Sequence, residues 1–230
     1  HGQTMLKDIK EEAIESLGYF LKPSELFSAI AKRGNNDSNN FILEDLTSIL
    51  RNIEQSTMGH ESEDDFEHLF ADLDLGSNRL GKTVEARNTL IAKVLFHLDN
   101  INFELKNHDR DVLGDAYEYL ISQFAAGAGK KAGEFYTPQQ VSKVLAKIVT
   151  NGKTKLKSVY DPTCGSGSLL IKASQEVGSK NFAIYGQEKN GQTQALCRMN
   201  MYLHEINDAK IEWGDTIRNP LHIEENRLMK

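Results

Sequence analysis

The sequence predicts an all-α domain over residues 1–125, followed by an α/β domain with a doubly wound parallel sheet over residues 126–230. The first half consists of stretches with apolar residues at helical spacing, separated by polar breaks. Residues 125–133 are mostly small and show no periodicity, which is typical of a connection between domains. Beyond them, helical patterns alternate with short apolar strands, and this alternation is the pattern of a doubly wound parallel sheet.

Polar breaks separate the helical patterns of the first half. The polar tract 34–40 cannot bury itself and is expected to be a loop. A cluster of carboxylates at 61–67 marks the start of one helix, where negative charge is favoured. Apolar periodicity predicts further helices within residues 6–17, 26–30, 43–53, 83–98 and 111–124.

The second half alternates helices with strands. A parallel sheet gathers the carboxyl ends of its strands at one edge, and open α/β folds bind their ligands there. Residues that follow the strands are therefore the first candidates for a site. The patterns predict helices over 138–149, 168–177 and 193–206 and strands over 158–160, 182–186 and 210–213.

Composition excludes several classes of protein. No apolar run approaches the ~20 residues that a membrane span needs, so we expect no contact with a membrane. The two cysteines, Cys164 and Cys197, are too few for a disulfide framework, and no export signal is visible. We therefore expect a soluble cytoplasmic protein with unbridged cysteines.

The net charge of −6 conceals an asymmetry between the two halves. Residues 1–108 hold 11 Lys/Arg against 19 Asp/Glu, a net charge of −8, whereas residues 109–230 hold 16 against 14, a net charge of +2. Affinity for a phosphate backbone rests mainly on Lys and Arg. Any contact with nucleic acid is thus expected to need another segment or a partner.

Two familiar ligand loops are excluded. Residues 72–76 resemble the start of a calcium loop, but the glycine stands at the fifth position instead of the sixth, and Thr83 occupies the position that requires a glutamate. The glycine-containing tract is not a phosphate-binding loop either, because Phe124 replaces its first glycine and Lys131 the magnesium-binding Ser or Thr. We expect neither a metal site nor ATP binding.

The most informative segment is residues 159–170, in which a strand ends in Asp161 and a turn with Gly165 and Gly167 opens a helix. Glycines let a ligand approach the backbone closely. Leu170 replaces the third glycine of the dinucleotide fingerprint, and the charge of Asp161 disfavours a pyrophosphate. The turn favours a cationic or zwitterionic ligand such as S-adenosylmethionine, whose ammonium Asp161 could hold, although a purely structural turn is compatible with this segment alone.

Three further features favour the ligand over the purely structural turn. Glu188 ends the next strand 27 positions after Asp161, where an acid can meet ribose hydroxyls, and Asp215 follows the third strand. Thr137 and Pro138 fit the start of a helix, as N-cap and first helical residue, with Gln140 completing a capping box. Capping does not require the adjacent pair Phe135 and Tyr136, which could cover a bound ligand.

Four segments, Gly-Glu-Phe-Tyr-Thr-Pro at 133–138, Asp-Pro-Thr-Cys-Gly-Ser-Gly at 161–167, Gly-Gln-Glu at 186–188 and Gly-Asp-Thr at 214–216, resemble in this order motifs X, I, II and III of amino-group DNA methyltransferases. The preceding helical region, including residues 74–81, is similar to that of the modification subunit of type I restriction-modification systems. The resemblance implies a Rossmann-like S-adenosylmethionine-dependent methyltransferase domain that methylates the exocyclic amine of adenine in DNA.

The resemblance also implies roles for individual residues. The motif X segment and the motif I turn would cradle the methionine end of the cofactor, Glu188 would bind the ribose and Asp215 the adenine. The implied cofactor-binding residues are Glu134, Phe135, Tyr136, Thr137, Pro138, Gln139, Asp161, Pro162, Gly165, Ser166, Gly167, Ser168, Glu188 and Asp215.

The sequence departs from the family at one point. The catalytic Asn/Asp-Pro-Pro-aromatic motif is absent, and Asn219-Pro220-Leu221-His222 is no substitute, because it lacks the second proline and the aromatic ring. We therefore expect the front part of a modification subunit, truncated before that motif, which keeps the cofactor-binding motifs, has no catalytic residue and is inactive alone. Residues 219–222 are expected to be a loop.

The resemblance implies partners: a DNA specificity subunit, a second modification subunit, a restriction subunit, and duplex DNA bound through the complex. Two other functions remain open at this point. The acidic helical half could be a docking module with the α/β half as scaffold. Alternatively, the methyl acceptor could be RNA, protein or a small molecule, since the cofactor site alone does not identify it.

Overall fold

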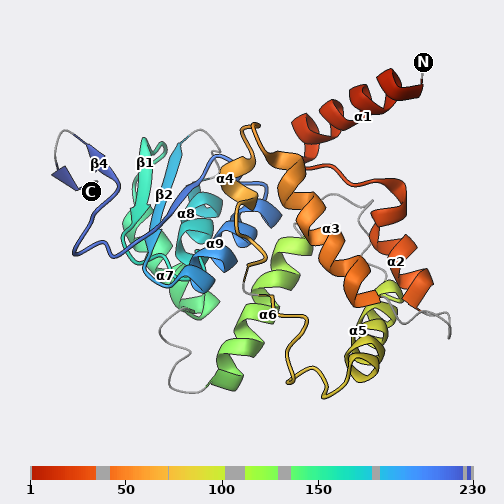
Figure 1. Ribbon diagram of the computed structural model, residues 1–230. Helices are drawn as coiled ribbons and strands as arrows, with labels where there is room; N and C mark the ends of the chain where they lie inside the picture. Colours follow the sequence, from red (N-terminus) through yellow and green to blue (C-terminus); the bar gives the residue numbers. More distant parts are fainter. Residues whose placement is uncertain are drawn as a thin grey trace. The chain divides into compact units, whose positions relative to one another are not determined.

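The computed structural model describes residues 2–34, 42–71, 73–101, 112–128, 136–177, 182–224 and 227–228. The chain forms two compact units, His1–Asn102 and Phe103–Lys230. The first is built of helices, and the second holds a parallel sheet with helices packed against it (Figure 1). The predicted fold class, a helical domain followed by an α/β domain with a parallel sheet, is confirmed.

The first unit packs its helices around Ile30, Ile42, Ile49 and Leu95. Thr83 begins α5 as expected, because its side chain accepts a hydrogen bond from the backbone N–H of Ala86 at 3.2 Å. The helix expected from the acidic segment at 61–67 is only one turn long, since the backbone leaves the helical conformation at Glu67. The elements are α1 (Gly2–Leu17), η1 (Pro23–Glu25), α2 (Phe27–Gly34), α3 (Ile42–Thr57), α4 (Glu63–Phe66) and α5 (Val84–Asp99).

The second unit contains a three-stranded parallel sheet in the order β1-β2-β3. Its crossover helices α8 and α9 pack against the strands and against each other, and Leu170, Ile171 and Met201 fill the core between them. The elements are α6 (Val112–Ala128), α7 (Gln139–Thr150), β1 (Ser158–Asp161), α8 (Ser168–Val177), β2 (Ala183–Glu188), α9 (Gly191–Leu203), β3 (Lys210–Trp213), β4 (Ile223–Glu224) and β5 (Arg227–Leu228).

Helix α6 belongs to the second unit, so the two units divide between residues 102 and 103, earlier than the expected boundary at 125/126. The helix packs against α9, and its Glu118 pairs with Lys172 of α8. Periodicity identified α6 as a helix but could not indicate the unit on which it packs. The helix also continues through Gly127 to Ala128, because its last residues are mostly alanines, which favour helix.

The segment 219–222 is a loop, as expected, and it is fixed to the sheet. The ring of His222 makes edge contacts with Tyr160 and Tyr185, which are paired on neighbouring strands, and its Nε2 lies 2.8 Å from the carbonyl oxygen of Gly186. A short antiparallel pair, β4 and β5, follows the loop and was not predicted. Among the described residues, no helix is long and apolar enough to cross a membrane.

Candidate functional site

A cavity of about 550 Å³ lies where the parallel strands end. The strand register pairs Asp161 with Gly186 and Glu188 with Trp213, so the ends of β1, β2 and β3 meet at one edge of the sheet. Nine of the predicted residues line the cavity: Tyr136, Thr137, Asp161, Pro162, Gly165, Ser166, Ser168, Glu188 and Asp215. The topology therefore brings together residues from all four sequence segments.

The turn between β1 and α8 is held in place by hydrogen bonds with β2 and α9. Gly165 and Gly167 adopt φ of 56° and 82°, a conformation that favours glycine. The backbone N–H of Cys164 donates to the carbonyl of Gln187 at 3.1 Å, and the side chain of Asn200, fully buried on α9, donates to the carbonyl of Ser166 at 3.0 Å. These bonds fix the turn, several residues of which line the cavity.

Glu188 connects β2 to the turn after β1. Its Oε2 accepts a hydrogen bond from the backbone N–H of Gly165 at 3.0 Å, and its Oε1 accepts one from the N–H of Asn190 at 2.8 Å. Each carboxylate oxygen has a second acceptor position, so Glu188 can still accept from a ligand hydroxyl. Its geometry is fixed before any ligand binds.

Asp161 carries a negative charge that the protein compensates poorly. Its Oδ1 accepts a hydrogen bond from the N–H of Thr163 at 3.0 Å. Burial raises the pKa of Asp161, the nearby charge of Glu188 raises it further, and the bond from Thr163 only partly offsets both effects. Burial therefore disfavours the ionised form of Asp161, and a cation placed beside it would stabilise that form.

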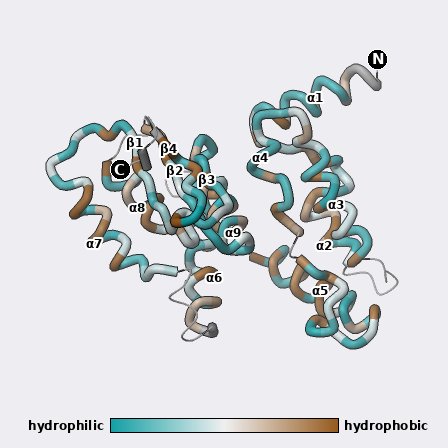
Figure 2. The backbone as a smooth tube through the Cα atoms, turned by 60° about the vertical axis from the view of Figure 1, so that its left-hand side comes forward, coloured by the Kyte–Doolittle hydropathy of each residue, from teal (hydrophilic) through white to brown (hydrophobic). Residues whose placement is uncertain are grey.

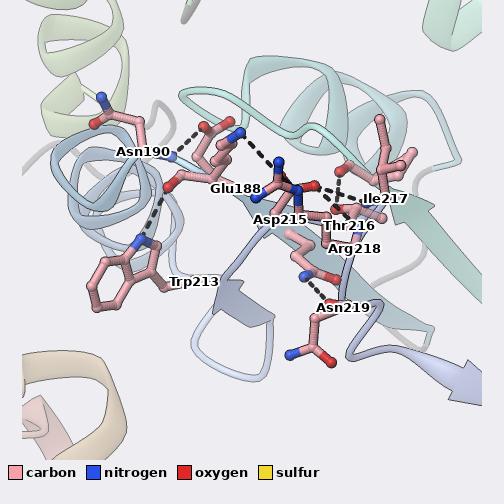
Figure 3. Close-up of polar contacts among 11 residues, drawn as sticks. Glu188, Asn190, Trp213, Asp215, Thr216, Ile217, Arg218 and Asn219 are labelled. Carbon is pink, nitrogen blue, oxygen red and sulfur yellow. Dashed lines mark hydrogen bonds and ion pairs between the residues drawn. The ribbon is translucent and has the colours of Figure 1, made fainter.

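Asp215 is, by contrast, already paired with a cation. Its Oδ2 lies 3.0 Å from Nζ of Lys189, and its Oδ1 accepts from the N–H groups of Ile217 and Arg218 (Figure 3). The hydrogen bond from Lys189 is the largest cause that lowers the pKa of Asp215. The carboxylates of Asp215 and Asp161 therefore lie in opposite electrostatic environments within one cavity.

Residues 214–217 form part of the cavity wall, and the segment 214–221 is anchored at several points. The fully buried side chain of Gln187 donates to the carbonyl of Asn219 at 2.9 Å and accepts from the N–H of Leu221 at 3.0 Å. The hydroxyl of Thr216 donates to the carbonyl of Pro162 at 2.6 Å. Between these anchors, Ile217 lines the cavity with a side chain that is 95% exposed.

Comparison with known proteins identifies the family. The model of the N-6 DNA Methylase family matches residues 108–229. The chain belongs to the N-6 DNA methylase family. It is 41% identical over 211 residues to the type I restriction enzyme MpnII methylase subunit of Mycoplasma pneumoniae, an alignment that covers 87% of this chain and 38% of that protein.

Two further matches agree with this family. The type I restriction enzyme MjaVIII methylase subunit of Methanocaldococcus jannaschii is 40% identical over 132 residues, which cover 55% of this chain and 22% of that protein. The crystal structure of a type I restriction-modification system methyltransferase subunit from Streptococcus thermophilus superposes with a TM-score of 0.82 at 38% identity, covering 95% of this chain and 45% of that one. The present chain thus spans less than half the length of these relatives.

Three predicted residues of this N-6 DNA methylase do not line the cavity. Gly167 faces α9, where an added Cβ would lie 2.6 Å from Cε of Met201 and 2.7 Å from Sγ of Cys197. The side chain of Gln139 donates instead to Glu118 of α6, and Pro138 precedes α7. Glu134 and Phe135 lie outside the described residues.

The expected helix cap at Thr137 is wrong. In this N-6 DNA methylase, α7 begins at Gln139, its N-cap residue is Pro138, and no side-chain hydrogen bond caps the helix. Pro138 has φ −53° and ψ 136°, which is not a helical conformation, so the helix starts after it. The side chain of Thr137 is left to line the cavity.

Sequence reasoning missed seven residues of the cavity wall. Four of them lie inside the quoted motif segments 161–167 and 214–216, and the other three follow a motif within two residues, so the motifs could have indicated them. Among the described residues of this N-6 DNA methylase, no cluster of three His, Cys, Asp or Glu could hold a metal ion. The missed residues are Thr163, Cys164, Leu169, Lys189, Gly214, Thr216 and Ile217.

Proposed function

We propose that this N-6 DNA methylase binds S-adenosylmethionine in the cavity at the edge of the sheet, as part of an enzyme that methylates the exocyclic amine of adenine in DNA. The observation that carries the proposal is the poorly compensated charge of Asp161 next to the glycine turn. Membership in the family and the similarity to type I methylase subunits support the reaction.

The charges of the cavity wall suit the proposed cofactor. Among the described residues, the wall holds three carboxylates, Asp161, Glu188 and Asp215, against one cation, Lys189, which is already paired with Asp215. A pyrophosphate would add negative charge beside Asp161, whereas S-adenosylmethionine brings an ammonium and a sulfonium. The donor set thus fits this cofactor and disfavours a dinucleotide.

We assign roles to the residues from their positions. Asp161 holds the ammonium, Glu188 accepts from the ribose hydroxyls with its unused lone pairs, and Asp215 accepts from the adenine amine. Tyr136, Thr137, Ser166 and Ser168 surround the methionine end, and Glu134 and Phe135 remain proposed members of the same group. Gly167, Pro138 and Gln139 contribute through the packing of the turn and of α7.

The cofactor supplies a methyl group already activated by the sulfonium charge, so no metal is required. The residues of this chain orient the methyl donor and limit its freedom, which is the part of catalysis that positioning supplies. In the proposed reaction, the target adenine leaves the duplex and its amine meets the methyl group in line. No residue of these 230 is assigned to hold that base.

The family relationship also supports a proposal about assembly. The relatives are named as methylase subunits of type I restriction enzymes. We propose that the protein works as the modification subunit of such a complex in the cytoplasm. Its partners there are a DNA specificity subunit, a second modification subunit and a restriction subunit, and it reaches duplex DNA through the complex.

Isothermal titration with S-adenosylmethionine tests the cofactor proposal. The wild-type chain should bind saturably, and Asp161→Asn and Glu188→Gln should each weaken binding about tenfold or more, since a hydrogen bond to a charged group contributes about 1.5–3 kcal/mol. Glu212→Gln is the control, because Glu212 is exposed on β3 and does not line the cavity. Failure of a folded wild-type chain to bind would contradict the proposal and favour a docking or scaffold role.

A further inference from the structure

Helix α6 lies outside the four sequence motifs, yet it supplies a fully buried carboxylate, Glu118. The side chain of Glu118 is fully buried between α7 and α8. Its Oε2 lies 3.0 Å from Nζ of Lys172, which is 13% exposed, and accepts a hydrogen bond from Nε2 of Gln139 at 2.9 Å. One oxygen atom therefore contacts two helices.

Both contacts fall at the helix ends that form the cavity. Gln139 is the first residue of α7 and follows the cavity-lining Tyr136 and Thr137 closely. Lys172 lies one turn into α8, whose first residue, Ser168, also lines the cavity. Glu118 thus holds two helix starts that each carry part of the cavity wall.

Stability alone is a poor reason for this arrangement. A buried ion pair costs desolvation that its own attraction often fails to offset, and apolar side chains of similar volume are frequently as stable. Oε1 of Glu118 is buried and has no hydrogen-bond partner among the described residues, which adds to the cost. The contact does fix the positions of α7 and α8 relative to each other, because the single atom Oε2 contacts Gln139 of one helix and Lys172 of the other.

We propose that Glu118 is a positioning residue that sets the separation between the starts of α7 and α8 and thereby the shape of the cofactor cavity. It acts through Gln139 and Lys172 and does not itself touch the ligand. The inference rests on the proposed binding of S-adenosylmethionine, and it makes Gln139, which the sequence suggested as a cofactor contact, a link in this connection.

The first arm of the test measures affinity for S-adenosylmethionine by isothermal titration. Glu118→Gln and Gln139→Leu should each lower the affinity between about tenfold and a hundredfold, the penalty that displacing a binding group by about 1 Å incurs. The double variant Glu118→Leu/Lys172→Met removes both charges and should unfold at no lower temperature than the single variants. Its affinity should nevertheless stay low, since the connection to Gln139 is lost.

The control is an ion pair that joins α7 and α8 directly, without α6. Lys147 of α7 lies 3.8 Å from Glu176 of α8, and neither residue lines the cavity. Lys147→Met should leave the affinity within about twofold of the wild type, as expected for an exposed pair. Wild-type affinity in the apolar double variant would overturn the proposal, because Glu118 would then be only structural.

Hydrogen exchange separates this proposal from the one on which it rests. In the unliganded chain, Glu118→Gln should accelerate exchange at the amides of Thr137, Ser166 and Ser168 more than Lys147→Met does. If the wild-type chain binds no S-adenosylmethionine, the proposed function fails while this arm still tests the connection. Unchanged exchange at all three amides would contradict the positioning role whatever the ligand.

Discussion

The predicted acids act through a charged side chain, and the predicted glycines act by adopting a backbone conformation that other residues rarely adopt. Asp161 and Asp215 were predicted from the same observation, an acid after a strand, yet burial raises the pKa of the first and Lys189 lowers the pKa of the second. Gly165 and Gly167 were likewise predicted together, but only Gly165 lines the cavity. Equivalent sequence signals therefore have different physical roles.

Asp161→Asn should stabilise the unliganded chain at neutral pH and weaken binding of S-adenosylmethionine. The folded-state pKa of Asp161 is raised above its unfolded value, so ionisation of Asp161 opposes folding. The penalty is absent below the unfolded pKa of 3.8 and grows as the pH rises through the folded pKa. Urea denaturation of both chains across this interval should give a difference in unfolding free energy that increases with pH. A difference independent of pH would contradict this origin.

Gly167→Ala should destabilise the second unit by about 1–3 kcal/mol, the usual cost of overpacking, in addition to backbone strain. The added Cβ would overlap Met201 and Cys197 at a φ of 82°. Gly152→Ala is the matched control, with φ 72° and no atom within 4 Å of the added Cβ. Chemical denaturation should give a clearly larger loss at position 167 than at 152. Equal losses would mean that backbone conformation alone requires the glycine.

At the scale of elements, tertiary packing can bury a different face of a helix from the one that its apolar residues indicate. Helix α7 is amphipathic, and Figure 2 shows hydrophobic residues along it. Its buried residues are nevertheless Ser142, Ala146 and Thr150, while Val144 and Ile148 are exposed. The helix packs closely on α8, where small side chains allow a short distance between the axes. Periodicity located the helix correctly but did not indicate which of its faces the described residues bury.

The segment 214–221, of which residues 214–217 line the cavity, should depend on Gln187, whose amide holds the backbone at Asn219 and Leu221. Gln187→Glu keeps an acceptor for the N–H of Leu221 but directs a carboxylate at the carbonyl of Asn219. It should lower stability by about 1–3 kcal/mol, the cost of an unsatisfied buried group. Limited proteolysis should then cleave within 214–221 faster than in the wild type. Unaltered cleavage would indicate that Thr216 and His222 suffice to hold the segment.

At the scale of the whole molecule, charge is unevenly divided along the chain. Residues 1–108 carry a net charge of −8 and residues 109–230 a net charge of +2. The compact units divide near the same point, and the family model begins there, at residue 108. The acidic part therefore coincides largely with the helical unit, and the cavity at the sheet edge belongs to the other unit.

The isolated chain should bind duplex DNA weakly and should not methylate it. Its net charge of −6 opposes a phosphate backbone, and the Asn/Asp-Pro-Pro-aromatic motif that would hold the base is absent from its sequence. Mobility-shift titration should give a dissociation constant no tighter than the roughly 10⁻⁴–10⁻⁶ M of non-specific binding at physiological salt. Transfer of a labelled methyl group to duplex DNA by the chain alone would contradict this expectation.

The sequence by itself determined the order of the elements, the fold class and most of the cavity. Strand, turn and helix follow from periodicity and glycine placement, and a parallel sheet must bring the ends of its strands to one edge, so Asp161, Glu188 and Asp215 could be grouped without coordinates. Only the tertiary structure decided what packs across the chain: α6 on α9, Gln139 on Glu118, Gly167 on Met201, and Lys189 on Asp215. These contacts join residues distant in sequence or depend on side-chain direction, and no local pattern encodes either.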